Sequence, residues 1–370
     1  MRLSYWEQEK VFENLDYIIV GAGIVGSFTA YFLNKLQPQA KILIVDRGVL
    51  PLGASTKNAG FACFGSITEM MDDLESIDEN ALMQIIKMRV DGLNLLKQIV
   101  PPKEMQFDQC GGYEVVKPST SSITHDHIQH FNKLVKSVTG LEKTFAIRDD
   151  PFNTNFDTNF IFNQFEGKLH PVRMLHYLHN QLTSNGVNFI FGTMVNKIEK
   201  KLVIASNLGE AKFNIHANKI LLCNNAFANS FLKEDIKPAR NNVLVTQRIP
   251  NLKLNGTFHF DKGYVYFRNI ENRILIGGAR NLDADQETTN ELGFNDKIIN
   301  QLKDILSTYI LPGTDPKIEY QWSGIMGVGS TKKPIIKQIS PHLYAGIRLG
   351  GMGVAIGSLV GKELANLASK

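Results

Sequence analysis

Cysteine is scarce in this chain, and no cysteine has another close to it in the sequence. The 370 residues include three cysteines, Cys63, Cys110 and Cys223. Their wide separation matches neither a disulfide framework nor the paired spacing of a structural metal site. We therefore expect three reduced thiols, with Cys63 acting as a small buried apolar residue.

Long apolar runs and a strong charge bias are also lacking. The N-terminal segment carries charges throughout and has no apolar core followed by a small-residue cleavage site, so no secretory signal is predicted. The uncharged run over 17–34 is interrupted by glycines and is typical of a strand, a turn and a helix. A formal net charge of +4 indicates no polyanionic partner such as nucleic acid. The expectation is a cytoplasmic protein that acts on a small molecule.

Familiar catalytic and metal-binding patterns are missing as well. No Ser-His-Asp, Cys-His or paired-carboxylate signature indicates nucleophilic or acid–base hydrolysis. The histidines His125, His127 and His130 have spacing compatible with a metal, but they lie in a polar, Ser/Thr-rich segment typical of a solvated surface. No metal is expected. The acidic run over 69–80 is predicted to cap a helix that begins near Ala81, and 330–334 is predicted to be a charged turn.

The clearest positive signal is a glycine loop between two short apolar runs. "DYIIV" and "KILIVD" are typical of strands buried on both faces of a parallel sheet, and "SFTAYFLNKL" has helical spacing. Between the two strands, the loop "GAGIVG" comprises Gly21, Ala22, Gly23, Ile24, Val25 and Gly26. Its glycines permit a tight turn, the approach of a pyrophosphate and close packing of helix on strand. Asp46 can accept hydrogen bonds from a ribose and disfavours a cofactor with a 2′-phosphate, so the unit predicts a site for FAD or NAD.

The segment that follows Asp46 resembles a known family. "RGVLPLGASTKNAGFACFGS" is similar to the flavin-wrapping segment of the D-amino acid oxidase superfamily of FAD-dependent enzymes, which includes glycine oxidase, sarcosine oxidase and D-amino acid dehydrogenase. The resemblance continues through 167–199 and on to the C-terminal region. It implies that FAD is contacted by Arg47, Ala54, Ser55, Asn58, Ala59, Gly60 and Val195.

A second glycine cluster, "GIRLGGMGVAIG", precedes the C-terminal helix. The resemblance implies flavin contacts from Gly346, Gly350, Gly351, Met352, Gly353 and Val354. Free backbone N–H groups at the start of that helix can stabilise negative charge on a reduced flavin. An NAD dehydrogenase has no evident use for such a loop, so the two clusters together favour FAD. One departure is "CNNA" over 223–226, where relatives usually have an alanine-threonine-glycine turn.

The predicted fold class is α/β, with a doubly wound Rossmann-type FAD-binding domain and a second domain made mostly of an antiparallel sheet. The chain is longer than one ordinary core requires, so two domains are expected. The FAD-binding domain is predicted to comprise 1–80, 160–235 and 322–370. The substrate domain is predicted to comprise 81–159 and 236–321.

The resemblance implies an FAD-dependent oxidase or dehydrogenase that oxidises the C–N bond of an amino acid or amine by hydride transfer to the flavin. Tyr266, Arg280 and Arg348 are the candidate catalytic residues by position. Arg280 or Arg348 is expected to bind a substrate carboxylate, because Met326 stands where relatives often carry an arginine. The alternatives are a 2-hydroxy acid dehydrogenase, a nicotinamide-dependent dehydrogenase and a flavin-binding assembly protein without turnover. The electron acceptor is left open.

Overall fold

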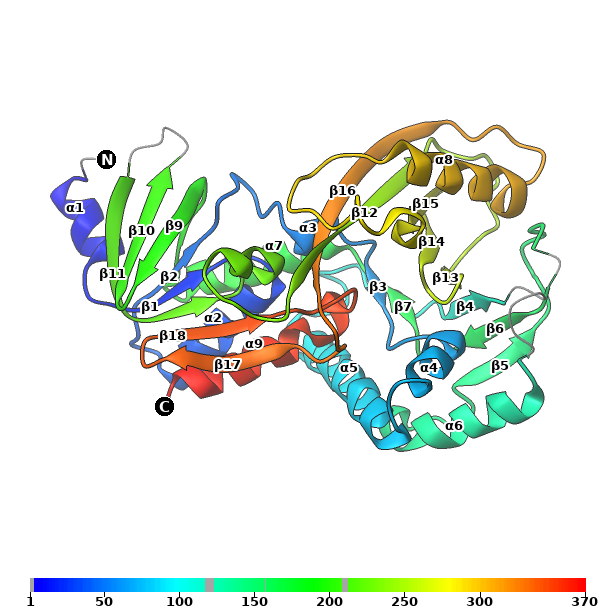
Figure 1. Ribbon diagram of the computed structural model, residues 1–370, viewed down its shortest axis with the longest axis horizontal. Helices are drawn as coiled ribbons and strands as arrows, with labels where there is room; N and C mark the ends of the chain where they lie inside the picture. The colour runs from blue at the N-terminus through cyan, green and yellow to red at the C-terminus, as the bar shows by residue number, and fades with distance from the viewer. Residues whose placement is uncertain (1–2, 117–122, 157, 208–211) are drawn as a thin grey trace.

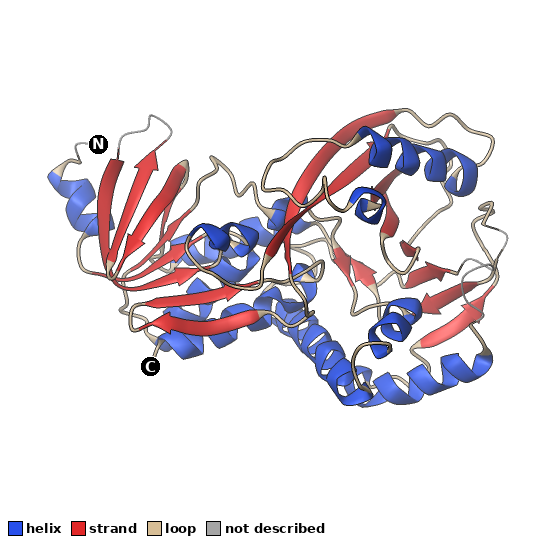
Figure 2. Cartoon of the chain, in the orientation of Figure 1, coloured by secondary structure: helices blue, strands red, loops and turns tan. Residues whose placement is uncertain are grey.

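Two large mixed sheets dominate the molecule and lie toward its opposite ends (Figures 1 and 2). The computed structural model describes residues 3–116, 123–156, 158–207 and 212–370. The first sheet takes strands from the start, the middle and the end of the chain, and the second takes separated strands between residues 112 and 328. Neither sheet is therefore made by one continuous stretch of sequence.

The first sheet has a parallel centre. Its strands are β1 (Leu15–Val20), β2 (Ile42–Val45), β8 (Asn188–Ile190), β9 (Thr193–Glu199), β10 (Leu202–Asn207), β11 (Lys212–Leu222), β17 (Ile335–Ser340) and β18 (Leu343–Ile347). Strands β18, β11, β1, β2 and β8 are neighbours in that order, and each neighbouring pair is parallel. Strand β17 pairs antiparallel with β18, and β10 joins β9 to β11 in an antiparallel extension.

Side chains of β1 alternate between two hydrophobic cores. Tyr17 and Ile19 pack in a core with four helices, whereas Ile18 and Val20 pack in a core that includes β9 and β10. The four helices are α2 (Ile24–Leu36), α5 (Glu79–Ile99), α7 (Pro171–Ser184) and α9 (Gly353–Ala368). Burial on both faces explains why residues 17–20 of β1 form an uninterrupted apolar run. Within the described ranges, no helix has the length and apolar character needed to cross a membrane.

The second sheet is mainly antiparallel. In spatial order its strands are β16 (Ile318–Val328), β12 (Lys237–Thr246), β15 (Arg273–Gly278), β14 (Val265–Ile270), β13 (Thr257–Phe260), β4 (Gly112–Val115), β6 (Phe160–Asn163) and β5 (Phe145–Arg148). The exception to the antiparallel pairing is β13 with β4. Helix α8 (Asp296–Ile305) packs in the core on one face of this sheet, together with Phe258, Phe267 and Ile276.

The remaining elements connect the two sheets. They include β3 (Phe61–Ala62), which pairs with β7 (Gly167–Lys168), and the helices α4 (Ile67–Leu74) and α6 (His125–Thr139). Helices α4 and α6 share a hydrophobic core with part of α5 and with β5 and β6. Figure 1 shows α5 running from beneath the first sheet toward α6 under the second.

The predicted α/β fold, with a doubly wound sheet beside a mainly antiparallel one, is confirmed. The strand pairing differs from the predicted boundaries at two places. The boundaries group 160–163 and 322–328 with the first sheet, whereas β6 and β16 pair within the second. The division of the chain into two domains stays a prediction.

Helices α5 and α9 approach each other closely at Gly92. A Cβ atom at this position would lie 2.1 Å from the carbonyl oxygen of Ala355 and 3.1 Å from Cα of Ile356. The hydroxyl of Ser358 donates a hydrogen bond of 2.6 Å to the carbonyl oxygen of Gly92. Because the atoms that a Cβ at Gly92 would meet are backbone atoms of α9, no side-chain rotation can open this space.

We expect Gly92→Ala to lower the free energy of unfolding by about 1–3 kcal/mol, because an added methyl group forces packed helices apart. Urea unfolding followed by circular dichroism measures this change. Asn94→Ala, at an exposed position of the same helix, is the control and should be neutral or slightly stabilising. A Gly92→Ala chain as stable as the parent would contradict the close approach of α5 and α9.

Candidate cofactor and substrate site

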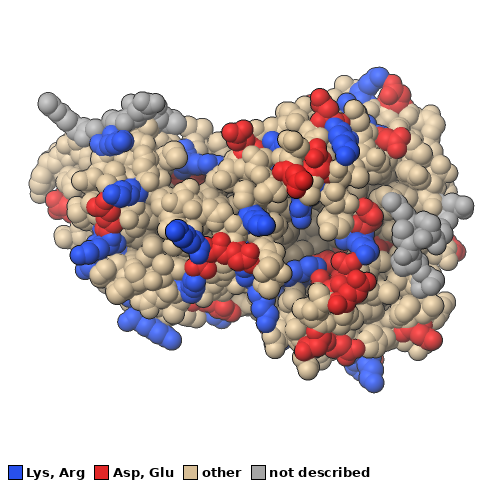
Figure 3. All heavy atoms as spheres, in the orientation of Figure 1, with Lys and Arg blue, Asp and Glu red and all other residues tan. Residues whose placement is uncertain are grey.

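A cavity of about 880 Å³ is lined by residues of both sheets and of the loops between them. Figure 3 shows the surface hollowed between the two ends of the molecule, with acidic and basic side chains gathered around the hollow. Most residues predicted to bind a cofactor or substrate line this cavity: Gly21, Gly23, Ile24, Val25, Asp46, Arg47, Ala54, Ser55, Asn58, Ala59, Gly60, Val195, Tyr266, Arg280, Arg348, Gly350, Gly351, Met352, Gly353 and Val354. Their individual roles stay predictions.

Three predicted cofactor residues are absent from the lining, namely Ala22, Gly26 and Gly346. A Cβ at Gly26 would lie 2.0 Å from the carbonyl oxygen of Gly21, so this glycine allows α2 to pack against the turn. A Cβ at Gly346 would lie 2.9 Å from a methyl of Leu364, a residue of α9. Gly26 and Gly346 therefore allow close packing behind the residues that line the cavity.

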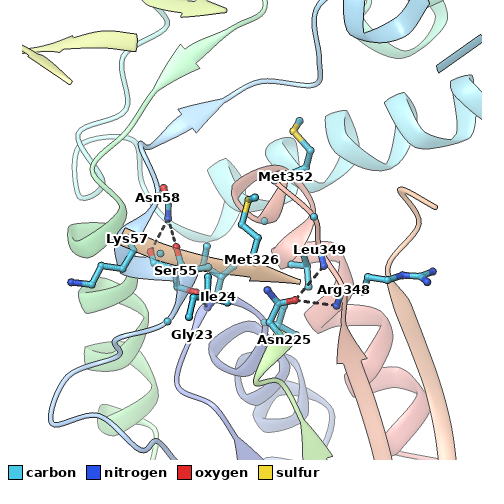
Figure 4. A pocket seen from close by; sticks show the side chains of 18 of the residues that line it. Gly23, Ile24, Ser55, Lys57, Asn58, Asn225, Met326, Arg348, Leu349 and Met352 are labelled. Carbon is cyan, nitrogen blue, oxygen red and sulfur yellow. Dashed lines mark hydrogen bonds between the residues drawn. The ribbon is translucent and has the colours of Figure 1, made fainter. Parts of the chain in front are cut away.

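A hydrogen bond joins the N-terminal glycine loop to the predicted cofactor loop over 54–60. Gly21 has a φ of +109°, and a Cβ there would meet the carbonyl oxygen of Cys223 at 2.9 Å. A Cβ at Gly23 would meet the hydroxyl of Ser55 at 2.7 Å, and this hydroxyl accepts a hydrogen bond of 2.9 Å from the N–H of Ile24. The bare backbone at Gly23 and the start of α2 suit a pyrophosphate, which such a loop binds through N–H groups. Figure 4 shows Gly23, Ile24 and Ser55 together.

Asp46 lies at the end of β2 and braces the same loop. One carboxylate oxygen accepts the N–H of Ala22 and the other accepts the N–H of Gly48, both at 2.9 Å. Burial raises the pKa of this carboxyl, and the two backbone hydrogen bonds oppose that shift. Each oxygen keeps acceptor capacity, so Asp46 can also accept hydrogen bonds from ribose hydroxyls, as its position predicts.

The loop over 54–60 is held in shape by the amide of Asn58. Its nitrogen donates to the carbonyl oxygens of Ala54 and Ser55, and its oxygen accepts the N–H of Gly60 at 2.8 Å. The indole of Trp322, on β16, donates a hydrogen bond of 2.9 Å to the carbonyl oxygen of Lys57. The loop is therefore anchored to the second sheet as well as to α2.

Asn225, in the unusual "CNNA" turn, positions the C-terminal loop. Its side-chain oxygen accepts the N–H of Arg348 at 3.0 Å and the N–H of Leu349 at 3.4 Å. Gly350, with a φ of +57°, donates its N–H to the carbonyl oxygen of Gly327. Sequence reasoning identified the turn as a departure from the resemblance but did not predict this support. The two adjacent asparagines of this turn were the signal that the sequence offered.

Arg348 differs from the expectation that it contacts substrate or flavin. Its guanidinium donates hydrogen bonds to the carbonyl oxygens of Asp235 and Lys333, the carboxylate of Asp235 and the hydroxyl of Thr331. Figure 4 shows the side chain pointing away from Met326 and Met352. Because five contacts occupy its donors, Arg348 holds the loop in place and has no N–H left for a substrate.

The second sheet presents a row of facing residues to the cavity. Tyr266 on β14 lies opposite His259 on β13 and Gly277 on β15, so all three are on one face. A Cβ at Gly277 would lie 2.8 Å from the ring and the hydroxyl oxygen of Tyr266, and its absence makes room for this side chain. Desolvation raises the pKa of the Tyr266 phenol, which therefore stays protonated at neutral pH.

A partly buried ion-pair cluster around α4 and α5 was not predicted. Glu69 accepts hydrogen bonds from the guanidinium of Arg89 at 3.2 Å and from the ammonium group of Lys332 at 2.8 Å. Lys332 also pairs with Asp73, and Lys262 pairs with Asp72. The acidic run was expected to be only a cap, although Asp78 does cap α5 through the N–H of Ala81. Sequence could not show that α4 faces the cavity.

The histidine run lies on the surface helix α6. His127 forms a capping box with Thr124, and His130 lies 3.1 Å from Glu79. The side chains of His125 and His130 are exposed. This arrangement agrees with the predicted solvated surface run.

Comparisons with known proteins agree with this geometry. A family model described as FAD dependent oxidoreductase matches residues 16–367. A curated relative from Haemophilus influenzae, named "Probable oxidoreductase OrdL", is 21% identical over 374 residues, covering 95% of this chain and 82% of the relative.

Solved structures share the fold over nearly the whole chain. Glycine oxidase from Bacillus cereus ATCC 14579 has a TM-score of 0.75 at 14% identity and covers 96% of this chain and 97% of its own. Iminodiacetate oxidase from Chelativorans sp. BNC1 has a TM-score of 0.74 at 16% identity and covers 95% of each chain. At these identities the likeness concerns the fold alone.

The ion-pair cluster predicts a pH-dependent stability. Burial alone would raise the pKa of Glu69, but the charges of Arg89 and Lys332 lower it from 4.5 to about 2. The folded chain therefore gains stability from ionised Glu69 above pH 4.5 and loses it as the pH falls toward 2. We expect Glu69→Gln to lower the free energy of unfolding by about 3 kcal/mol at pH 7, and by progressively less below pH 4.5.

Urea unfolding of the parent chain and Glu69→Gln across this pH range tests the prediction. Glu75→Gln, at an exposed position just after α4, is the control and should change stability little at any pH. A difference between the parent and Glu69→Gln that is independent of pH would contradict the assignment of an ionised, paired Glu69.

Proposed function

This chain belongs to the family of FAD-dependent oxidoreductases, and we propose that it oxidises the C–N bond of an amino acid or amine by hydride transfer to the flavin. FAD is its cofactor. Solved structures that share the fold are named glycine oxidase and iminodiacetate oxidase, whose substrates carry a carboxylate next to the amine-bearing carbon. A substrate of this class needs a fixed cation and a polar group beside the flavin.

The proposal rests mainly on one observation: among the described residues, the guanidinium of Arg280 has no partner. Among the described cavity arginines, Arg89 pairs with Glu69, Arg348 pairs with Asp235, and Arg47 lies over the ring of Phe227. Arg280 lines the cavity with no hydrogen bond or ion pair to another described residue. A guanidinium with its donors free can bind a carboxylate through two parallel hydrogen bonds.

Arg280 and Tyr266 lie at the same end of two paired strands of the second sheet, β15 and β14. Arg280 follows the end of β15, where the N–H of Ala279 donates to the carbonyl oxygen of Tyr264 at 2.7 Å. Tyr266, on the neighbouring strand, lines the same cavity. We assign Arg280 to the substrate carboxylate and the protonated phenol of Tyr266 to a second hydrogen bond that orients the substrate.

The chain's remaining contribution is to exclude water and to place positive potential at the cavity. Bound FAD supplies the acceptor for the hydride that leaves the substrate carbon. As the C–H bond breaks with its electron pair, the nitrogen lone pair forms the C=N bond of an imine, which water later hydrolyses. The unpaired N–H groups at Gly353 and Val354 open α9 at the cavity wall and can stabilise negative charge that develops there.

The visible spectrum under anaerobic conditions tests this function. We expect the purified protein to be yellow and its flavin absorbance to bleach when a small amino acid or amine is added, because the substrate reduces the flavin without oxygen. Bleaching by a 2-hydroxy acid alone would transfer the reaction to a C–OH bond. A flavin that dithionite reduces but that no amine, amino acid or hydroxy acid reduces would favour an assembly protein without turnover.

The role of Arg280 is tested separately by substitution. Arg280→Met should raise the substrate's apparent dissociation constant at least about tenfold, which corresponds to losing a charge-assisted hydrogen bond, and should leave flavin content unchanged. Titration of anaerobic flavin bleaching measures the constant. Arg273→Met is the matched control, because Arg273 pairs with Glu319 outside the cavity lining. An unaltered constant in Arg280→Met removes Arg280 from the site.

A further inference from the structure

Three side chains from distant segments converge on one wall of the cavity. The sulfur of Cys63, a carboxylate oxygen of Glu166 and a ring nitrogen of His259 all lie within 4.8 Å of one another. Cys63 follows β3, Glu166 lies in the turn between β6 and β7, and His259 is on β13. Cys63 and Glu166 are buried, and the side chain of His259 is 12% exposed. The sequence separates these residues by about a hundred positions each, so no spacing motif relates them.

A thiolate, an imidazole and a carboxylate form the donor set that Zn²⁺ prefers in proteins. Three protein ligands with one position left open are typical of zinc sites that exchange a water or another small ligand. Ideal tetrahedral ligands around zinc lie roughly 3.3–3.6 Å apart, so the three donors need to move inward by about 1 Å at most. Side-chain rotation of Cys63 and Glu166 can supply a movement of this size.

The hydrogen bond between Nε2 of His259 and Oε1 of Glu166 measures 2.5 Å. A proton now holds these two atoms together, and a divalent cation can replace that proton between them. The carboxylate is already oriented by the hydroxyl of Thr257, which donates to the same oxygen at 2.9 Å. A Cβ at Gly112 would lie 2.3 Å from the carboxyl carbon of Glu166, so the bare backbone there makes room for the ligand. Such outer contacts set the orientation of metal ligands.

The surrounding charge also favours a cation. Glu114 lies directly opposite His259 on the neighbouring strand and is buried. Its carboxylate accepts the N–H groups of Ile67 and Thr68 at the start of α4. Two buried carboxylates, those of Glu114 and Glu166, thus flank one imidazole. A dication at this point compensates more of their negative charge than a single shared proton does.

We propose that Cys63, Glu166 and His259 form a binding site for Zn²⁺ in the wall of the flavin cavity. Cys63 and His259 line the cavity and Glu166 stands behind them, so the open coordination position faces the cavity. A water molecule or a small anion completes the tetrahedron from that side. The site does not depend on the proposed substrate, because its ligands belong to the chain itself.

Zinc uptake by the FAD-loaded protein tests the site. After equilibrium dialysis against Zn²⁺ and removal of free metal, we expect one zinc per chain in the parent protein. Cys63→Ser, Glu166→Gln and His259→Asn should each weaken binding at least about a hundredfold, since even an outer-shell change costs up to that factor. Cys110→Ser is the matched control, because Cys110 is a partly buried thiol outside the group and should leave uptake unchanged.

Substitution by Co²⁺ identifies the ligands. Tetrahedral cobalt absorbs at longer wavelengths than oxidised flavin, and coordination by sulfur adds a charge-transfer band that Cys63→Ser alone should abolish. Flavin content and thermal melting show whether each variant folds. If Cys63→Ser does not fold, the metal uptake of His259→Asn and Glu166→Gln tests the site instead. A parent protein that takes up no more zinc than Cys63→Ser, or a cobalt spectrum without tetrahedral bands, overturns the proposal and leaves a hydrogen-bonded pair only.

Discussion

The parallel pairing of β1, β11 and β18 is the constraint on which the cofactor site depends. Val20 is in register with Leu222, which is in register with Ala345, so the carboxyl ends of the three strands meet at one edge of the sheet. Ligands bind at such edges in doubly wound folds because the loops there converge. The two glycine clusters, more than three hundred residues apart in the chain, therefore open into the same cavity. The turn that carries Asn225 lies between them and bonds to the second.

The second sheet forms the opposite wall of the cavity at this edge. Its face carries Tyr266 and His259 side by side, and the missing side chain at Gly277 gives Tyr266 its room. The surrounding charges are mostly neutralised in pairs, as Glu69 is by Arg89 and Lys332. Pairing leaves Arg280 as a cation available to a ligand, and the proposed binding of a substrate carboxylate rests on this.

The same wall holds a second kind of chemistry. The oxidoreductase reaction requires only that the chain orient a substrate beside the flavin, and no acid or base side chain is obligatory for hydride transfer. The proposed reaction therefore assigns no role to the buried group of Cys63, Glu166 and His259. A metal bound there would lie on the side of the cavity where Tyr266 lies. Its charge would change the affinity of the cavity for a charged substrate, and a bound substrate would change the affinity for the metal.

The sequence by itself determined the dinucleotide-binding unit and the fold class, because the signals for both are local, whereas the choice of FAD over NAD needed the family resemblance and the C-terminal glycine cluster. The strand, glycine loop, helix and terminal Asp46 are contiguous, and each part performs its function within a few residues of the next. The boundaries between sheets were harder, since β6 and β16 pair with strands that lie far away in the chain. Pattern alone does not show which of two sheets a strand joins.

Only the tertiary structure decided how the charged and polar side chains are used. Sequence left both Arg280 and Arg348 as candidates, but folding engages the guanidinium of Arg348 with Asp235 and leaves that of Arg280 without a partner among the described residues. Sequence likewise interpreted Cys63 as a small buried residue, and the structure confirms its burial, but only folding shows that it lies beside His259. The physical reason is the same in both cases. A side chain's role depends on partners that the chain delivers from distant positions, and those partners leave no pattern near the residue itself.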